Sequence, residues 1–290
     1  MKSLLKNPIV VAGFLLLVLV CVLFNPIIFG GKTFGSSDSL APKAVGIALN
    51  SIQEKTGEFP LWQPWVFSGM PTAEAFTNVS KLYFPDYLSN LFFLPGMIIQ
   101  LLHLLFAGIG GFILLRHFKC SEWAAGLGAV AFMITPYMVT MVVFGHGSQM
   151  MTAAYIPWIL WLTVRLWQNP NLWNTGWLAI LLGFQLQRAH AQIAYYTWLL
   201  IGAYSLLILI NGIRNSEDRS NIGKGFGLFS LACLIGIGIS LLIYLPAMEY
   251  TPFSVRGGSA GGGADYNYAT GWSFHPKEIL TFFIPSAFGF

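Results

Sequence analysis

Long apolar segments separated by short polar turns dominate this chain. The first apolar run extends from about Pro8 to Phe29, and six more fall at about 90–115, 123–144, 150–167, 173–189, 192–213 and 225–248. A helix needs about 20 apolar residues to cross the hydrocarbon core of a bilayer. A last run begins near Ile279 and is still apolar at Phe290. The pattern predicts an all-α, polytopic transmembrane helix bundle of seven spans with the start of an eighth. We expect residues 1–290 to form one membrane domain, the amino-terminal part of a longer protein.

The longest polar stretch separates the first two apolar runs, from Gly30 to Ser89. Apolar residues recur in it at helical spacing, at Val45, Ala48, Leu49 and Ile52. This spacing predicts an amphipathic helix that lies on the membrane surface. Residues 30–89 are therefore interpreted as a long first outer loop within the membrane domain.

The composition excludes several classes of protein. Hydrophobic residues make up 56% of the chain and charged residues 9%, whereas soluble proteins carry roughly a quarter charged residues. So few charges could not cover the surface of a soluble enzyme, and the apolar content excludes disorder. The net charge of +4 is not gathered in a basic cluster, so we expect no nucleic-acid partner. The three cysteines form no CxxC pair, which gives no support for redox chemistry or a thiolate metal site.

The distribution of the few charges predicts the orientation of the bundle. With the N-terminus in the cytoplasm, eight Lys and Arg residues fall in short inner turns, as the positive-inside tendency requires. They are Lys2, Lys6, Arg116, Lys119, Arg165, Arg214, Arg219 and Lys224. Eight of the eleven acids then fall outside. Most of the polar chemistry is therefore expected on the extracytoplasmic face.

Asp38 is the first candidate for chemistry. It stands with Ser39 just ahead of the predicted amphipathic helix, which has Pro42 in its first turn. One reading is an N-cap, a common use of aspartate. The other is a carboxylate kept charged at a helix start, where it can accept a proton or hold a metal ion.

Aromatic residues follow in the same loop. Trp62 and Trp65 belong to a proline-broken segment that we expect at headgroup depth. They are typical of an interfacial aromatic belt, and they could also form a platform for a sugar ring or an isoprenoid tail. Glu74 follows on the outer side and is a further candidate for substrate binding.

Four outer cations are candidates for binding a lipid phosphate: His146, His190, Arg188 and Arg256. Cations at membrane level are costly unless they are paired or face water, so they are functional suspects. The alternative is that Arg188 or Arg256 pairs with Glu249 or extends to the headgroups. No HExxH or paired-histidine spacing indicates a zinc site.

Five strings in order resemble the bacterial YfhO family, integral membrane glycosyltransferases of the GT-C class. They are FGSSDSLAPK, PLWQPWVFSGMP, FGHGSQMMTAAYIPWIL, AHAQIAYY and LPAMEYTPFSVRGG. The resemblance implies a polyprenyl-phosphate sugar donor, an outward-facing site in the bacterial cell membrane and a catalytic acid in the first outer loop, where only Asp38 stands. Many GT-C relatives have an acidic pair there, and this chain has one Asp between serines, which leaves a divalent metal ion as an open alternative.

The leading hypothesis is a glycosyltransferase that moves a sugar from a polyprenyl-phosphate donor to an envelope glycan or lipid. Asp38 would take the proton of the acceptor hydroxyl, and the outer cations would offset charge on the departing phosphate. A transporter or lipid flippase is the alternative, and it predicts ionisable residues at mid-membrane depth. A non-catalytic scaffold for envelope assembly is a third possibility.

Overall fold

The computed structural model describes residues 7–66, 68–72, 83–214, 219–254, 266–271, 273–284 and 286–288. Within these ranges the regular structure is helical, apart from one antiparallel pair of two-residue strands, β1 (Trp62–Gln63) and β2 (Met70–Pro71). The prediction of an all-α protein is confirmed.

The chain divides into two compact units, Met1–Tyr244 and Leu245–Phe290. The helices that begin in the first unit are α1 (Pro8–Leu23), α2 (Asn25–Ile28), α3 (Ser37–Thr56), α4 (Phe84–Leu91), α5 (Gly96–His117), α6 (Glu122–Met133), α7 (Pro136–Val143), α8 (Gly147–Ala154), α9 (Ile156–Gln168), α10 (Leu172–Gln187), α11 (Ala191–Arg214) and α12 (Arg219–Tyr250). The second unit holds the end of α12, a 3-10 helix at Thr251–Phe253, α13 (Tyr266–Thr270) and a 3-10 helix at Pro276–Phe282.

Four helical segments are long and apolar enough to cross a membrane: Gly96–His117, Glu122–Val143, Ala191–Arg214 and Ser220–Phe253. The first apolar run forms the shorter helix α1, of 16 residues. These segments support a polytopic membrane protein, while the seven-span topology stays a prediction.

Two apolar runs that look continuous in sequence are broken at prolines. The run at 123–144 divides into α6 and α7, and the run at 150–167 divides into α8 and α9. Pro136 and Pro157 each stand in the first turn of the second helix of the pair. Proline has no N–H to donate to a preceding turn and fits where the first helical N–H groups need no partner. The adjacent ends of these two runs therefore become the short helices α7 and α8, joined by a turn at Phe144–His146.

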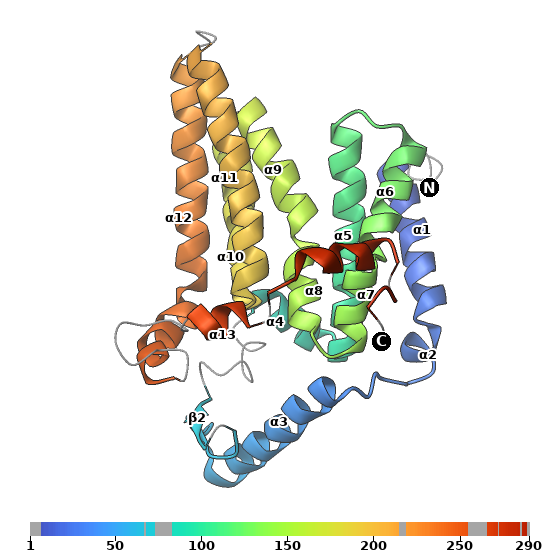
Figure 1. Ribbon diagram of the computed structural model, residues 1–290, viewed down its shortest axis with the longest axis vertical. Coiled ribbons are helices and arrows are strands. Elements are labelled where there is room, and N and C mark those ends of the chain that lie inside the picture. The colour runs from blue at the N-terminus through green and yellow to red at the C-terminus, as the bar shows by residue number, and fades with distance from the viewer. Residues whose placement is uncertain are drawn as a thin grey trace. The chain divides into compact units, whose positions relative to one another are not determined.

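Helix α5 packs against α1, α6, α8 and α9 (Figure 1). Small residues let its neighbours approach closely, as is common between membrane helices. A Cβ added to Gly111 would lie 3.5 Å from the Cα of Ala129 on α6, and one added to Gly108 would lie 2.9 Å from the Met133 sulfur. Leu104, Ala107 and Met133 are fully buried in the resulting core.

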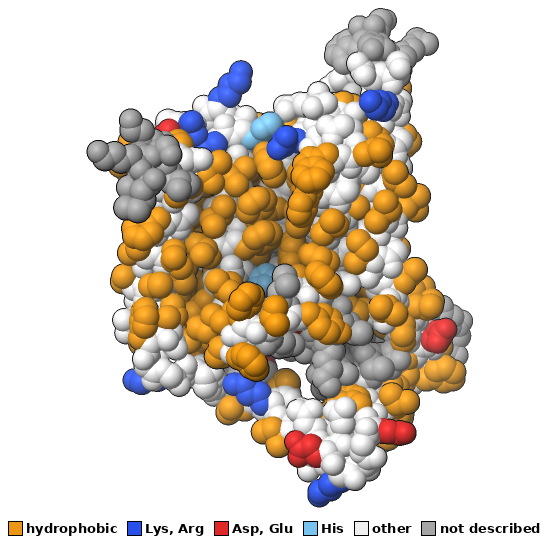
Figure 2. Space-filling model, turned by 180° about the vertical axis from the view of Figure 1, so that it is seen from behind, with side chains coloured by type: hydrophobic (Ala, Val, Ile, Leu, Met, Phe, Trp, Pro, Cys, Tyr) orange, Lys and Arg blue, Asp and Glu red, His pale blue; other side chains and the backbone are white. Residues whose placement is uncertain are grey.

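The ends of the first unit differ in charge. His117 Nε2 lies 2.9 Å from Gln168 Oε1, so the carboxyl ends of α5 and α9 meet. This end carries Arg116, Lys119 and Arg165, and we call it the basic end. Figure 2 shows Lys and Arg side chains along the upper end, a mixture of Lys or Arg with Asp or Glu side chains in the lower part, and apolar side chains over the sides of the helices. The turn between α7 and α8 lies at the opposite end.

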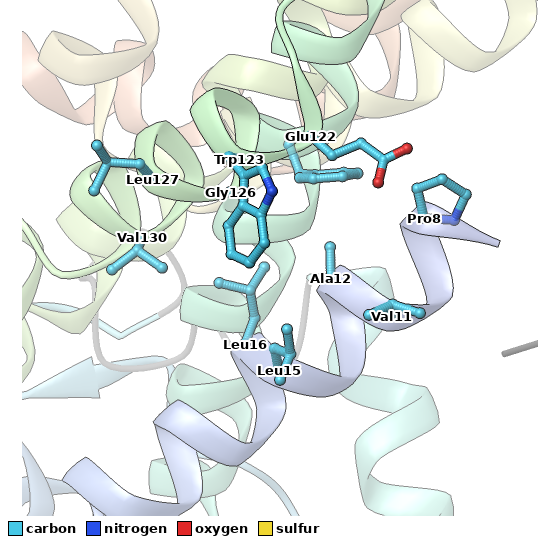
Figure 3. A pocket seen from close by; sticks show the side chains of 11 residues that line it. Pro8, Val11, Ala12, Leu15, Leu16, Glu122, Trp123, Gly126, Leu127 and Val130 are labelled. Atoms are coloured by element: carbon cyan, nitrogen blue, oxygen red, sulfur yellow. The ribbon is translucent and has the colours of Figure 1, made fainter. Parts of the chain in front are cut away.

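An apolar groove runs between α1 and α6 (Figure 3). It encloses about 610 Å³, and Leu15, Trp123 and Val130 are among its lining residues. The side chain of Trp123 is 91% exposed. A face of this kind suits contact with hydrocarbon chains, in keeping with the apolar sides of the helices.

Candidate functional site

Asp38 lies in the first turn of α3, at the end of the unit opposite the basic end. Ser36 is the N-cap residue, with extended backbone, and its side chain makes no capping hydrogen bond. The Ser36 and Ser39 hydroxyl oxygens lie 2.6 Å apart. Asp38 lies inside the first turn of α3, so it is not the cap, and its carboxylate is available for other contacts.

Asp38 and His146 meet across a long stretch of sequence. His146 Nε2 lies 3.2 Å from Asp38 Oδ2, and both side chains are about half exposed, at 45% and 58%. An acid and an imidazole at this distance form an ion pair when the imidazole is protonated, and each restricts the orientation of the other. The structure therefore brings together two residues that the sequence marked separately.

Gly145 explains why this pairing is possible. Its φ angle is +89°, in the left-handed region that favours glycine. A Cβ at this position would lie 2.6 Å from the backbone nitrogen of Ser39 and 2.7 Å from the carbonyl carbon of Asp38. The turn between α7 and α8 thus lies directly against the first turn of α3, and His146 follows in that turn as the N-cap residue of α8.

His190 lies between α10 and α11 and is half-buried. Burial lowers the pKa of the His190 imidazole, and the charge of His146 lowers it further, while a backbone hydrogen bond works in the other direction. Its Nδ1 atom is buried and has no hydrogen-bond partner in the described part of the chain. His190 therefore holds a buried polar ring nitrogen without a partner among the described residues.

Arg188 has a different environment from the two histidines. Its Nη1 atom lies 3.6 Å from Asp86 Oδ2, and each of the two side chains is 10% exposed. The guanidinium carbon lies 4.5 Å from the centre of the Tyr83 ring, a cation–π distance. Burial raises the pKa of the Asp86 carboxyl, and the positive charge of Arg188 opposes that rise. Arg188 therefore pairs with Asp86 and not with Glu249.

Tyr83 connects the Arg188–Asp86 pair to a buried chain of polar side chains. His103 Nδ1 donates to the Ile99 carbonyl at 2.7 Å, so its Nε2 accepts from the Tyr83 hydroxyl, also at 2.7 Å. The Tyr83 oxygen in turn accepts from the Tyr155 hydroxyl. Burial raises the pKa of Tyr83 well above its ordinary value, so the phenol stays neutral. We call Tyr83, Asp86, His103, Tyr155 and Arg188 the buried polar network.

Gln187 fastens this network to its surroundings. Its Oε1 atom accepts from the backbone N–H of Phe84 at 3.3 Å, and its Nε2 donates to the Ile239 carbonyl at 3.1 Å. One side chain therefore joins α4, α10 and α12. Helix α4 is therefore held against the bundle at the place where Asp86 meets Arg188.

Sequence reasoning missed Tyr83, Asp86, His103 and Tyr155. The predicted orientation places Asp86 among the eight outer acids and says nothing about its pairing. The usable signal was that Arg188 and Asp86 both stand beside the end of an apolar run, where a buried charge needs an opposite one. Nothing local marked the two tyrosines, because their hydroxyl groups find partners only after the helices pack.

The predicted aromatic platform is exposed. Trp62 and Trp65 are each 54% exposed, and Trp62 pairs with Pro71 across the two short strands. A Cβ on Gly69 would lie 2.5 Å from the Trp62 ring, so that indole covers the glycine. No contact joins these rings to Asp38 or His146 within the described residues. Glu74 and Arg256 lie outside the described residues.

A divalent ion would find two ligands in the Asp38–His146 pair. Among the described residues, no group of three or more His, Cys, Asp or Glu side chains could hold a metal ion. The residues present therefore do not complete a metal site, and no catalytic step is assigned to a metal.

Comparisons with protein-family models, curated protein sequences and solved structures find no match for this chain.

Proposed function

We propose that this chain is an integral membrane glycosyltransferase of the GT-C type, related to the YfhO family. It would transfer a sugar from a polyprenyl-phosphate donor to an envelope glycan or lipid on the outer face of the bacterial cell membrane. The observation that carries the proposal is the Asp38–His146 pair, at 3.2 Å, with a carboxylate open to solvent.

Asp38 and His146 each have one role in the proposed reaction. The acceptor hydroxyl oxygen attacks the anomeric carbon of the sugar while the bond from that carbon to the phosphate oxygen breaks. The hydroxyl proton passes to the Asp38 carboxylate, which acts as general base, and the polyprenyl phosphate leaves with the bonding electrons. His146 is a positioning residue, because its contact fixes the direction of the carboxylate.

Charge on the departing phosphate needs hydrogen-bond donors. Arg188 Nε is buried and makes no hydrogen bond within the described residues, so this N–H is the donor proposed for a phosphate oxygen, while Nη1 faces Asp86. Arg256 and Glu74 complete the proposed set of substrate-binding residues together with His190. The exposed Trp62 and Trp65 rings supply stacking surfaces for a sugar or an isoprenoid chain.

The test is sugar transfer by the full-length protein in proteoliposomes with a labelled polyprenyl-phosphate sugar. Asp38→Asn keeps the shape of the side chain but removes the base, and we expect transfer to fall at least a hundredfold, since general bases contribute about 10²–10⁴-fold. Glu54→Gln is the matched control, because Glu54 is an exposed acid on the same helix. Transfer by Asp38→Asn at the control rate would refute the catalytic assignment.

The buried polar network favours transport as a second candidate function. Ionisable groups enclosed in a helix bundle are typical of substrate pathways in transporters. The same proteoliposomes separate the two functions. A flippase would move the labelled lipid between leaflets without transferring its sugar, and Arg188→Gln would then stop the movement while Asp38→Asn would not.

A further inference from the structure

A second site lies at the basic end, away from Asp38. A pocket of about 300 Å³ opens between α5, α9 and α10. Four tryptophans, Trp158, Trp161, Trp173 and Trp177, line it together with Phe106 and Arg165. Pockets of about 300–1,000 Å³ bind small molecules, so this one is large enough for part of a lipid and too small for a whole one.

Contacts between the rings hold the walls of the pocket in place. Phe106 and Trp158 stack with centres 4.9 Å apart and planes at 15°. Trp158 Nε1 donates to the Phe106 carbonyl at 2.8 Å. On the facing helix, Trp173 and Trp177 meet edge to face at 5.8 Å. The aromatic surface therefore exists before any ligand arrives, which reduces the entropy lost on binding.

Arg165 gives the pocket a positive charge. Its guanidinium carbon lies 5.0 Å from the centre of the Trp161 ring. No carboxylate lies within ion-pair distance of Arg165 in the part of the chain that the structure describes. Arg116 and Arg188, by contrast, form ion pairs with Glu122 and Asp86. A half-buried arginine without one favours an anionic ligand.

The position of Arg165 indicates which kind of anion would bind to it. The residue lies in the last turn of α9, at the end where His117 contacts Gln168. Tryptophan settles at the boundary between headgroups and hydrocarbon, and clustered basic residues attract anionic lipids there. Phosphate oxygens suit a guanidinium, and the adjoining acyl chain suits indole faces.

We propose that this pocket binds an anionic phospholipid, with the lipid phosphate on Arg165 and the start of an acyl chain against the four tryptophans. The remainder of the lipid lies in the surrounding bilayer. The site is separate from the proposed transferase residues, so it holds or fails independently of that function.

Fluorescence quenching tests the proposal with the full chain in vesicles. Brominated phosphatidylglycerol is expected to quench tryptophan more strongly than brominated phosphatidylcholine. One basic residue contributes about 1 kcal/mol at an anionic surface, about a fivefold change in relative binding constant. Arg165→Gln should reduce the preference for the anionic lipid by about that factor, and Arg165→Lys should keep most of it, which shows that the fold is intact.

Arg116→Gln is the matched control, because Arg116 lies at the same end but is paired with Glu122 at 3.8 Å. Equal quenching by the two lipids in the wild type would overturn the proposal, as would an equal loss in the control variant. Displacement of the anionic lipid by excess inorganic phosphate would also overturn it, because the site would then bind a free ion and not a lipid.

Discussion

Removal of the Arg188 charge tests the buried polar network most directly. In Arg188→Met, the stem of the side chain is retained while Asp86 loses its cationic partner, 3.6 Å away in the wild type. Both side chains are 10% exposed, so water cannot replace the missing charge. Breaking a buried ion pair from one side costs about 3–5 kcal/mol. For a unit of this size, each kcal/mol corresponds to about 2–4 °C, which gives a fall in Tm of roughly 6–20 °C.

The pH dependence gives the prediction a second readout. Burial already raises the pKa of Asp86, and Arg188 holds that rise back. Without Arg188 the pKa of Asp86 rises further, and a carboxyl with a raised folded pKa binds more protons in the folded state than in the unfolded one. Stability is then greatest below the ordinary carboxyl pKa of about 4 and is lost as the pH rises toward the folded value. The Tm deficit of Arg188→Met should therefore be smaller at acidic pH than at neutral pH.

Thermal unfolding in detergent across this pH range is the measurement. Arg116→Met is the matched control, because its pair with Glu122 is 37% and 58% exposed and exposed pairs contribute about 0–1 kcal/mol. The double variant Asp86→Asn with Arg188→Met removes both charges and should recover part of the loss. A deficit no larger than that of the control, or one that does not change with pH, would show that the pair is not electrostatically important.

Three further substitutions test the proposed site and its support. Gly145→Ala places a Cβ 2.6 Å from Ser39 N at a positive φ. We expect this substitution to lower the free energy of unfolding by more than about 1 kcal/mol and to lower Tm and sugar transfer with it. Unchanged sugar transfer would contradict the contact. His146→Gln should lower kcat with little effect on KM, because a positioning residue acts through Asp38, and a change confined to KM would indicate a binding role. Tyr83→Phe removes the donor to His103 Nε2 and should cost about 1–3 kcal/mol in thermal unfolding, whereas the exposed Tyr87→Phe should cost much less.

The helices could be predicted from the sequence because apolar runs of spanning length have few alternatives to a helix in a membrane. The apolar face of α3 was also predictable: Leu49 is buried, and Val45, Ala48 and Ile52 are half-buried. The divisions at Pro136 and Pro157 were not predicted, because each proline lies within an unbroken apolar run. Hydropathy averaged over such a run does not report where the backbone changes direction.

The individual residues of the candidate site could be predicted from the sequence, but the contacts between them could not. Asp38, His146 and His190 each stood out as polar residues at the outer ends of apolar segments. The contact between Asp38 and His146 depends on the close approach of Gly145 to α3, which is a property of the packed helices. Arg188 was marked for the same reason, but its partner Asp86 belongs to a loop end whose position only the fold determines.

The two sides of the Asp38–His146 pair are anchored very differently. His146 is the N-cap residue of α8, in which six of the eight residues are buried, so the imidazole is attached to a helix that packs inside the bundle. Asp38 lies in the first turn of α3, which has one buried residue in 20, Leu49. A displacement of α3 would separate the Asp38 carboxylate from His146. Under the proposed function, access for a bulky lipid-linked sugar and contact between the proposed base and His146 would then correspond to two positions of α3.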